Sequence, residues 1–316
     1  MSKQKRCLVL GGRGFIGSHL VNALLDRGYF VRCFDRPHVA PLGDSHLTNF
    51  NFELYEGDFA SENDVANALE GCDVCYHLVS TTLPKSSNAD PVFDVESNLV
   101  GTIHLLTQAV KSGLKKVIFV SSGGTVYGDP TQLPIPELHS TDPVCSYGIT
   151  KLAIEKYLAL FHRLYGLDYT VLRLANPFGE GQRTHASQGA VAVFLGKVLR
   201  GESVEIWGDG SVVRDYIHIA DVVDALLISL DKSVDEHVFN IGSGRGRSLN
   251  EVLGGIGLAT GRLPDCRYLA GRGFDVPVSV LSIERAKNLL GWYPKVDFDY
   301  GLERFAAWLA NHPNAD

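Results

Sequence analysis

Tyr147 and Lys151 stand four residues apart in the segment YGITK, where a long helical pattern begins. Residues at this spacing project from the same face of a helix. A tyrosine with its ordinary pKa of about 10 is a poor base at neutral pH, and lowering that pKa to about 7 requires roughly 4 kcal/mol. A neighbouring ammonium helps because it favours the phenolate. The pair therefore predicts a proton acceptor, although the same spacing also occurs on ordinary exposed helices.

A glycine-rich turn, GGRGFIGSHL, follows the first apolar segment and contains Gly11, Gly14 and Gly17. Glycines at a strand-to-helix turn let a pyrophosphate approach the backbone N–H groups at the helix N-terminus. Asp35 ends the next apolar segment, where a carboxylate binds both ribose hydroxyls and repels a 2′-phosphate. The sequence therefore predicts NAD in preference to NADP, although the adjacent Arg36 would accommodate a phosphate. A bound, cationic nicotinamide would also help the tyrosine to ionise.

Short β-rich segments alternate with helical patterns through the first part of the chain. Strands separated by helices of this length imply right-handed crossovers and a parallel sheet. The expected fold is thus α/β, a doubly wound parallel (Rossmann) sheet with a second, smaller C-terminal substrate lobe. The expected strands cover residues 6–12, 30–35, 73–79, 116–122 and 169–176, and the expected helices cover 16–28, 62–71, 98–113 and 147–166.

The alternation loosens after Asn176 into loops rich in Gly, Arg and Pro, which indicates that the second lobe begins there. We expect residues 1–175 plus 211–243 to form the NAD-binding domain. Residues 176–210 plus 244–316 would then form the lobe that binds the substrate.

Composition limits the possible functions. The chain has 316 residues, of which 45% are hydrophobic and 21% charged, and this is enough for a large core. Its formal net charge of −7, without a long basic block, argues against nucleic-acid and membrane-surface binding, so an anionic ligand would need local arginines. There is no apolar segment of about 18 residues and no leader pattern, and we expect a cytoplasmic protein.

Six cysteines are scattered along the chain, mostly in apolar segments. This distribution is typical of reduced intracellular thiols and not of a disulfide framework. Cys72 and Cys75 do form a CxxC motif. Because a redox pair normally opens a helix, whereas CDVCYHLV has the pattern of a buried strand, we interpret both as structural.

Ten motifs, in order along nearly the whole chain, resemble the extended short-chain dehydrogenase/reductase family and, within it, the nucleotide-sugar 4-epimerases that act on UDP-glucose or UDP-N-acetylglucosamine. The motifs are GGRGFIG, GD at Gly57, YHL at Tyr76, SNLVGT at Ser97, SSGGTVYG at Ser121, YGITK at Tyr147, NPFGEGQ at Asn176, WGDGSVVRDYIHIADVVDA at Trp207, FNIGSG at Phe239 and LGWYP at Leu290.

The resemblance implies a set of site residues. Tyr147 and Lys151 would be catalytic and would also contact NAD. Asn98 has an alternative role as a helix cap. The other positions implied to lie near NAD are Gly11, Gly14, Phe15, Ile16, Gly17, Asp35, Asp58 and Phe59 beside the adenine, Leu78, Ser80 and Asn98.

The resemblance also bears on the hydroxyl of the segment SSGGTVYG. Many relatives have Ser or Thr four residues before the Tyr-Gly, but this chain has Gly123 there. In relatives with Ser or Thr before a Gly-Gly pair, that hydroxyl bridges the sugar 4-OH and the tyrosine. Ser122 takes this role here, Ser121 is expected to turn toward the backbone or the cofactor, and Thr125 is a possible substitute.

Related 4,6-dehydratases carry an Asp-Glu pair at this turn and related decarboxylases carry a glutamate, whereas Gly123, Gly124 and Thr125 supply neither acid nor base. Oxidation and reduction at C4 of the sugar, an epimerisation, needs only hydride and one proton. Two alternatives stay open: an NAD-dependent sugar-nucleotide dehydrogenase or reductase, and a non-catalytic NAD-binding regulator. The intact Tyr147 and Lys151 argue against the regulator.

By the same resemblance, Arg214 and Arg272 would contact the diphosphate of a nucleotide sugar, although either arginine could be a solvated surface charge. Asn176 would contact the phosphate-sugar region and Asp275 the ribose. Ser279, seven residues after Arg272, would line the wall beside the C2 substituent, and a side chain this small leaves room for an acetamido group. The alternative is that Ser279 caps the following helix.

The resemblance further implies a homodimer. Its seam would be formed by the helices around Leu99 to Val110 and Leu152 to Leu164.

Overall fold

A computed structural model describes residues 4–37, 49–185, 189–232, 234–271 and 276–312. Within them, no helix is long and apolar enough to cross a membrane. The chain divides into two compact units. Unit 1 comprises Met1–Tyr127, Thr141–Arg173 and Val223–Phe239, and unit 2 comprises Gly128–Ser140, Leu174–Val222 and Asn240–Asp316.

The centre of unit 1 is a seven-stranded sheet with the order β10-β6-β5-β4-β1-β2-β3. The pairs β1–β2, β1–β4, β2–β3 and β4–β5 are parallel, as expected for a doubly wound α/β fold. The strands are β1 (Arg6–Leu10), β2 (Phe30–Asp35), β3 (Phe52–Glu56), β4 (Val74–His77), β5 (Lys116–Ser122), β6 (Asp168–Leu174) and β10 (Val238–Ile241).

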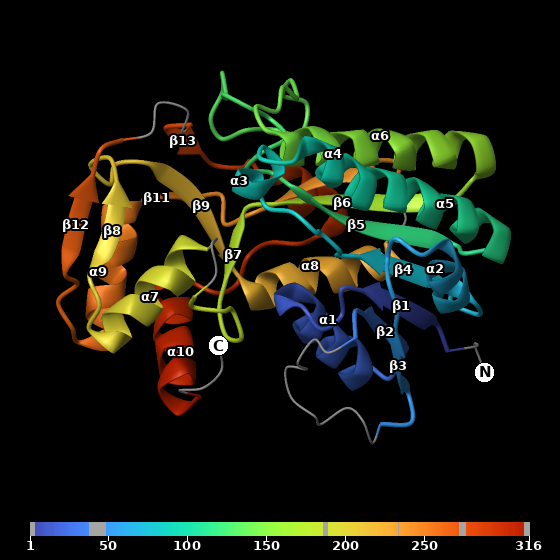
Figure 1. Ribbon diagram of the computed structural model, residues 1–316, viewed down its shortest axis with the longest axis horizontal. Coiled ribbons are helices and arrows are strands. Elements are labelled where there is room, and N and C mark those ends of the chain that lie inside the picture. Colours follow the sequence, from blue (N-terminus) through green and yellow to red (C-terminus); the bar gives the residue numbers. More distant parts are fainter. Residues whose placement is uncertain (1–3, 38–48, 186–188, 233, 272–275, 313–316) are drawn as a thin grey trace. The chain divides into compact units, whose positions relative to one another are not determined.

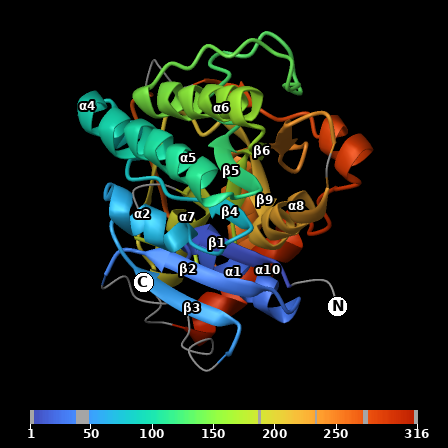
Figure 2. The ribbon, with the colours of Figure 1, turned by 90° about the vertical axis from the view of Figure 1, so that its right-hand side faces the viewer.

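Helices cover both faces of this sheet, with α2, α5 and α6 on one face and α1 and α8 on the other (Figures 1 and 2). A strand covered on both faces is expected to be mostly apolar, and Cys7 to Leu10 of β1 are indeed apolar and fully buried. The helices are α1 (Phe15–Asp26), α2 (Glu62–Leu69), α3 (Pro84–Ser87), α4 (Pro91–Asp94), the π-helix η2 (Val95–Val100), α5 (Gly101–Ser112), α6 (Ser146–Tyr165) and α8 (Ile219–Asp231).

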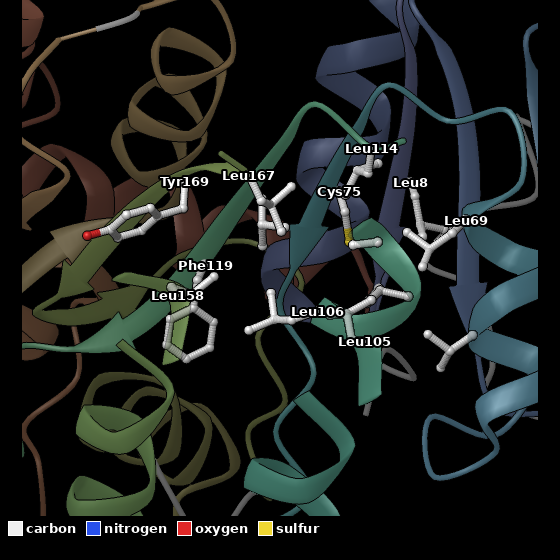
Figure 3. Close-up of a cluster of buried hydrophobic side chains, with 14 of the residues drawn as sticks. Leu8, Leu69, Cys75, Leu105, Leu106, Leu114, Phe119, Leu158, Leu167 and Tyr169 are labelled. Atoms are coloured by element: carbon white, nitrogen blue, oxygen red, sulfur yellow. The ribbon is translucent and has the colours of Figure 1, made fainter. Parts of the chain in front are cut away.

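A cluster of buried apolar side chains joins the strands to α2, α5 and α6 (Figure 3). Leu8 and Cys75 contribute from the strands, and Leu105, Leu106 and Leu158 from the helices. Cys72 and Cys75 are free thiols whose pKa burial raises, which agrees with a structural role for the CxxC motif.

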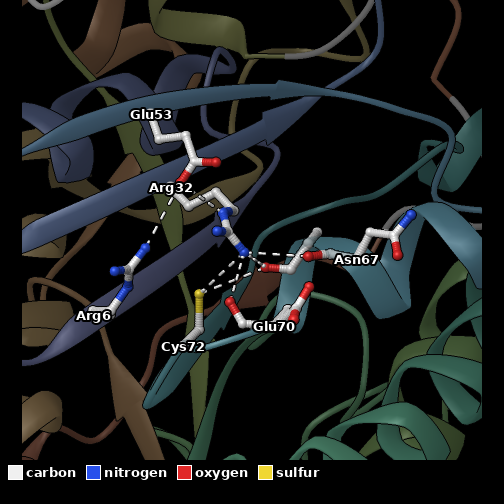
Figure 4. A network of polar contacts seen from close by, with 7 residues as sticks. Arg6, Arg32, Glu53, Asn67, Glu70 and Cys72 are labelled. Carbon is white, nitrogen blue, oxygen red and sulfur yellow. Dashed lines mark hydrogen bonds and ion pairs between the residues drawn. The ribbon is translucent and has the colours of Figure 1, made fainter.

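Arg32, in the middle of β2, shows how a buried charge is satisfied in this sheet (Figure 4). Its guanidinium donates to the backbone carbonyls of Asn67, Ala68 and Glu70 at 2.7–3.2 Å, and to Glu53 at 3.0 Å. Helix α2 ends at Leu69, so Arg32 caps the carbonyl groups at the C-terminal end of this helix, where Asn67 also accepts from the backbone N–H of Glu70.

Unit 2 contains a four-stranded sheet, in which β9 pairs with β7, β11 and β13, and a parallel pair, β12–β8. Helices α7, α9 and α10 pack around a second core that includes Phe178, Phe194 and Phe305. The elements are β7 (Asn176–Phe178), α7 (Ala190–Arg200), β8 (Val204–Trp207), β9 (Val213–His218), β11 (Gly246–Ser248), α9 (Leu249–Thr260), β12 (Cys266–Leu269), β13 (Val278–Ser279), the π-helix η3 (Ala286–Leu290) and α10 (Phe298–Asn311).

This division differs from the expected one at residues 128–140, 211–222 and 240–243, all of which belong to unit 2, and at the boundary residues 174–175. Residues 128–140 belong to unit 2, because Ile135 bridges Leu281 and its carbonyl accepts the side-chain amide of Asn240. The segment around β9 also belongs to unit 2, because its neighbours are β7, β11 and β13. Strand pairing over long sequence separations decides both assignments.

The structure also contains elements that sequence periodicity did not indicate. Strand β3 is short and only partly buried. The helix expected from residue 98 begins instead at Pro91, where the Asp90 side chain accepts from the backbone N–H of Phe93 at 3.0 Å. An aspartate followed by proline is a common helix start, so this signal was present in the sequence.

Candidate active site

Tyr147 and Lys151 lie on one face at the start of α6, as the four-residue spacing predicts. Lys151 is 4% exposed, and its Nζ donates to the carbonyl of Val120 at 3.1 Å near the end of β5. The same Nζ lies 4.7 Å from the Phe119 ring centroid and 5.6 Å from the Tyr147 ring centroid. The ammonium is therefore held beneath the tyrosine by the strand that leads to the serine segment.

Burial sets the protonation of this pair. It lowers the pKa of Lys151 to about 8, against the opposing effects of Asp94 and Glu155. It raises the pKa of Tyr147 to about 12, and the hydrogen bond with the Ser80 hydroxyl is the main influence in the other direction. Lys151 was expected to help the tyrosine to ionise. In the protein alone burial dominates instead, so the pair is a phenol and an ammonium at neutral pH.

The two serines at the end of β5 have different surroundings. Ser121 is buried and donates to Oε1 of Glu155 at 2.6 Å, so its hydroxyl turns to a side chain and not, as one of the expectations had it, to the backbone. Ser122 is partly exposed. The hydroxyl oxygen of Thr125 is buried and has no hydrogen-bond partner among the described residues. Ser122 is thus the accessible hydroxyl, and Thr125 is a second one that a ligand would satisfy.

The glycine turn has the geometry that a pyrophosphate requires. Gly11 has a φ of 80°, and a Cβ on Gly17 would lie 2.1 Å from the Gly11 carbonyl oxygen, so both positions need glycine. Gly14 is the N-cap of α1 and supplies no side-chain cap, and Phe15 and Ile16 are the first helical residues. Their N–H groups lack partners within the helix, and this N-terminus therefore suits an anionic group.

Asp35 lies beside this turn at the end of β2. Its two carboxylate oxygens accept from the backbone N–H groups of Arg13 and Arg36, each at 2.9 Å, which orients the carboxylate and leaves lone pairs for ribose hydroxyls. A Cβ on Gly11 would lie 3.4 Å from the backbone of Leu78, so the segment after β4 adjoins the turn. The residues of unit 1 therefore fit NAD at the carboxyl ends of the parallel strands.

The expected NAD contacts at positions 58, 59, 78 and 80 differ in how far their side chains are accessible to a ligand. Asp58 and Ser80 are exposed and Leu78 is partly exposed. The Phe59 ring is 6% exposed and packs 5.1 Å from the His77 ring, in the core, so only its backbone is available beside an adenine.

Asn98 lies inside the continuous helical segment formed by α4, η2 and α5, so it is not a helix cap. It is 5% exposed, and its Oδ1 accepts from the backbone N–H of Thr81 at 3.0 Å. Its amide nitrogen donates to the Thr81 hydroxyl at 2.7 Å. Asn98 thus holds the segment after β4, and the π-helical turn that presents it is of a kind frequent at functional sites.

Unit 2 contains a cavity of about 280 Å³. Asn176 and Arg214 both line it, together with apolar side chains that include Val191, Phe194 and Trp207. Aromatic and aliphatic walls with a few polar groups are typical of small-molecule sites. The sequence analysis did not identify Phe194 or Trp207 as lining residues.

Two of the remaining expected substrate contacts, Arg272 and Asp275, lie outside the described residues. Ser279 lies in β13 and is the paired neighbour of Arg214 on β9. The next helical turn begins only after Ile283, so Ser279 does not cap it. The Arg214 guanidinium donates to the carbonyl of Val276 at 2.7 Å, which fixes it beside β13.

Known proteins resemble this chain over nearly its whole length. Residues 7–242 match the model of the "NAD dependent epimerase/dehydratase family". A UDP-glucose 4-epimerase of Thermotoga maritima, solved with UDP-glucose, is 38% identical, with a TM-score of 0.91 over 98% of this chain and 100% of that one. A Thermus thermophilus UDP-glucose 4-epimerase, solved with NAD, is 33% identical, with a TM-score of 0.88 over 96% and 99%.

A UDP-N-acetylglucosamine 4-epimerase of Methanobrevibacter ruminantium is also similar, at 30% identity and a TM-score of 0.89 over 98% of this chain and 99% of that one. Similar chains thus differ in the sugars that their names record.

The raised pKa of Tyr147 is testable. In protein freed of NAD, we expect Tyr147 to contribute no phenolate absorbance below about pH 10, because burial disfavours its charged form. The measurement is the ultraviolet difference titration of the unmodified protein against Tyr147→Phe. A Tyr147 phenolate signal near neutral pH in the protein alone would contradict this account.

Proposed function

The chain belongs to the NAD-dependent epimerase/dehydratase family, and on that premise we propose that it interconverts UDP-sugars that differ in configuration at C4. NAD is its cofactor. The observation that carries the proposal is the buried Lys151 ammonium beneath Tyr147. This ammonium is bonded to Val120 of β5, the strand that ends at the accessible Ser122. Free thiols at all six cysteines support a reducing, cytoplasmic location, which cell fractionation would test.

The residues divide the work as follows. When bound, NAD supplies a hydride acceptor that can return the hydride. Tyr147 would act as the phenolate, which the cationic nicotinamide and the Lys151 ammonium favour. It takes the proton of the C4 hydroxyl through its phenolic oxygen and gives it back after the 4-keto sugar has turned. Lys151 is protonated below about pH 8 and keeps a positive charge 5.6 Å from the centroid of the Tyr147 ring. Ser122 hydrogen-bonds the sugar hydroxyl and Tyr147. No net proton or hydride is consumed.

Elimination and decarboxylation are less well supported. Gly123, Gly124 and Thr125 follow Ser122 directly, and none of them is an acid or a base at neutral pH. These reactions need such a group at the carbon that loses or gains the proton. The segment instead presents hydroxyl groups alone.

A panel of UDP-sugars, with products separated by chromatography, tests the function. We expect interconversion of C4 epimers without net change in the absorbance of reduced nicotinamide. Tyr147→Phe should lower turnover at least about 100-fold with NAD still bound, because it removes the proton acceptor. Steady formation of reduced nicotinamide would instead indicate a dehydrogenase, and inertness toward every sugar would indicate the regulator.

Ser122→Ala is the companion variant. It removes one hydrogen bond and leaves the base in place, so the loss should be smaller than for Tyr147→Phe. A larger loss in Thr125→Ala than in Ser122→Ala would identify Thr125 as the hydroxyl that contacts the sugar.

We further propose that unit 2 binds the nucleotide and its diphosphate, with Asn176 and Arg214 in the cavity and Arg272 and Asp275 as additional contacts. An arginine suits this role because its guanidinium forms charge-assisted hydrogen bonds to phosphate. Ser279 lies beside Arg214 and has a small side chain, and it would leave space for a C2 acetamido group. The substrates would then include UDP-N-acetylglucosamine and UDP-N-acetylgalactosamine alongside UDP-glucose and UDP-galactose.

Ser279→Tyr should abolish turnover of the acetamido sugars and spare the plain hexoses, because the phenol ring would occupy the space of the acetamido group. Relative kcat/KM values for the two sugar classes are the measurement, with Ser279→Ala as the matched control. Equal acceptance of both classes by the tyrosine variant would show that Ser279 does not select substrates.

A homodimer is proposed from exposed apolar side chains on neighbouring helices of unit 1. Val95 and Val100 of η2 and Leu160 and Leu164 of α6 are 37–59% exposed. Two such helices from each copy would bury these side chains in a four-helix seam.

Leu160→Asp should shift the protein from dimer to monomer in sedimentation velocity, because a carboxylate would be buried at the seam. Leu258→Asp, at an exposed apolar position on α9, is the control and should leave the dimer intact. A monomeric unmodified protein would contradict the proposal.

A further inference from the structure

Asp94, the last residue of α4, is a fully buried carboxylate in unit 1 that the mechanism above does not use. It accepts from the hydroxyls of Ser146 at 2.7 Å and Thr150 at 2.8 Å, from the Thr82 hydroxyl, and from the Asn98 amide at 3.2 Å. These partners come from three separate segments of the chain. One carboxylate therefore joins α6, the segment after β4 and the π-helix.

Two of these partners are the residues that directly precede the two members of the catalytic pair. Ser146 immediately precedes Tyr147, and Thr150 immediately precedes Lys151. Both hydroxyls donate to the same oxygen, Oδ2 of Asp94. The first turn of α6 is thus fixed against Asp94 at two points.

The start of α6 is also capped from a distance. Cys145, the N-cap residue, makes no side-chain cap. Instead, the backbone N–H of Ser146 donates to Oδ1 of Asn88 at 2.9 Å, and that of Tyr147 donates to the Ser87 hydroxyl at 3.0 Å. Both acceptors lie at the end of α3, shortly before α4. Free N–H groups of the helix that carries the tyrosine are therefore satisfied by the same part of the chain that carries Asp94.

The phenolic end of Tyr147 is connected to Asp94 as well. Ser80 lies close enough to the phenol to lower its pKa, and the Ser80 hydroxyl donates to the carbonyl of Thr82 at 3.1 Å. Thr82 in turn donates its own hydroxyl to Asp94. The backbone of Tyr147 is thus tied to Asp94 through the preceding residue Ser146, and its phenol lies near a segment that Asp94 holds through Thr82.

We propose that Asp94 is a positioning residue, which holds Tyr147 and Lys151 in the geometry for proton transfer through Ser146, Thr150 and Thr82. The inference rests on the proposed function. An ionised carboxylate suits the position because it only accepts, and its two oxygens provide enough lone pairs for all four donors. An asparagine there would accept through one oxygen alone and would leave hydroxyls of α6 without a partner.

Asp94→Asn is the first variant. We expect kcat to fall about 10- to 100-fold, because a small displacement of reacting groups has effects of this size, while KM stays within about threefold. Thr150→Val should lower kcat about 3- to 10-fold by removing one of these contacts, and Thr150→Ser should restore it. The double variant Asp94→Asn/Thr150→Val should be no slower than Asp94→Asn, since both changes break the same connection.

A second measurement reports position without turnover. In holoenzyme labelled with [13Cζ]tyrosine, the Tyr147 resonance is assigned by its loss in Tyr147→Phe. It should shift in Asp94→Asn and in Thr150→Val. If Asp94→Asn does not fold, Thr150→Val and Ser146→Ala decide the question by the same two readouts.

Asp221→Asn is the matched control. Asp221 is 2% exposed and accepts from the backbone N–H groups of Lys295 and Val296 at 2.9 and 3.0 Å in unit 2. We expect it to lower the melting temperature while kcat of the folded enzyme stays within about twofold and the Tyr147 resonance does not move.

An unchanged Tyr147 resonance in Asp94→Asn would overturn the inference, whatever happens to kcat, and so would an unchanged kcat. A wild-type enzyme that is inert toward every UDP-sugar would refute the proposed function instead. The resonance would then still decide whether Asp94 positions the tyrosine.

Discussion

The burial of the Lys151 ammonium is the constraint around which unit 1 is arranged. A charge taken out of water costs several kcal/mol unless partners replace the lost hydration. Here Nζ donates to the Val120 carbonyl, and the carboxylates of Asp94 and Glu155 act on it through space. Because both carboxylates are themselves nearly or fully buried, each needs partners of its own.

The partners that these two carboxylates require determine much of the surrounding structure. Glu155, on the next turn of α6 after Lys151, pairs with the buried Arg173 of β6 at 2.6 Å and accepts from Ser121. Asp94 is satisfied by uncharged donors from three segments. The set of buried side chains thus contains two cations and two carboxylates, and His77 stays uncharged beside them because burial and Lys151 lower its pKa to about 3. The burial of one lysine is therefore linked, through its partners and their partners, to the packing of α6 against β5, β6 and the π-helix.

The two units meet different chemical requirements. In unit 1, the parallel strands bring the glycine turn, Asp35 and the Tyr147–Lys151 pair to the carboxyl ends of the sheet, where backbone N–H groups and fixed charges are available. In unit 2, β7 and β9 place Asn176 and Arg214 on one cavity with apolar walls. Unit 1 thus presents backbone N–H groups, a carboxylate and the tyrosine–lysine pair, whereas unit 2 presents an arginine and a side-chain amide between apolar walls.

The sequence by itself determined what depends on local spacing and apolar pattern. The strand 116–122, the helix that carries Tyr147 and Lys151, and the need for glycine at positions 11 and 17 follow from periodicity and from the steric demands of a strand-to-helix turn. Only the tertiary structure decided how buried polar groups are paired. Ser121 turns to Glu155, 34 residues away, and Thr150 to Asp94, 56 residues away, and neither pairing has a local signature. The raised pKa of Tyr147 and the burial of the Phe59 ring have the same origin, since the loss of solvent at a side chain depends on segments that pack on it from elsewhere in the chain.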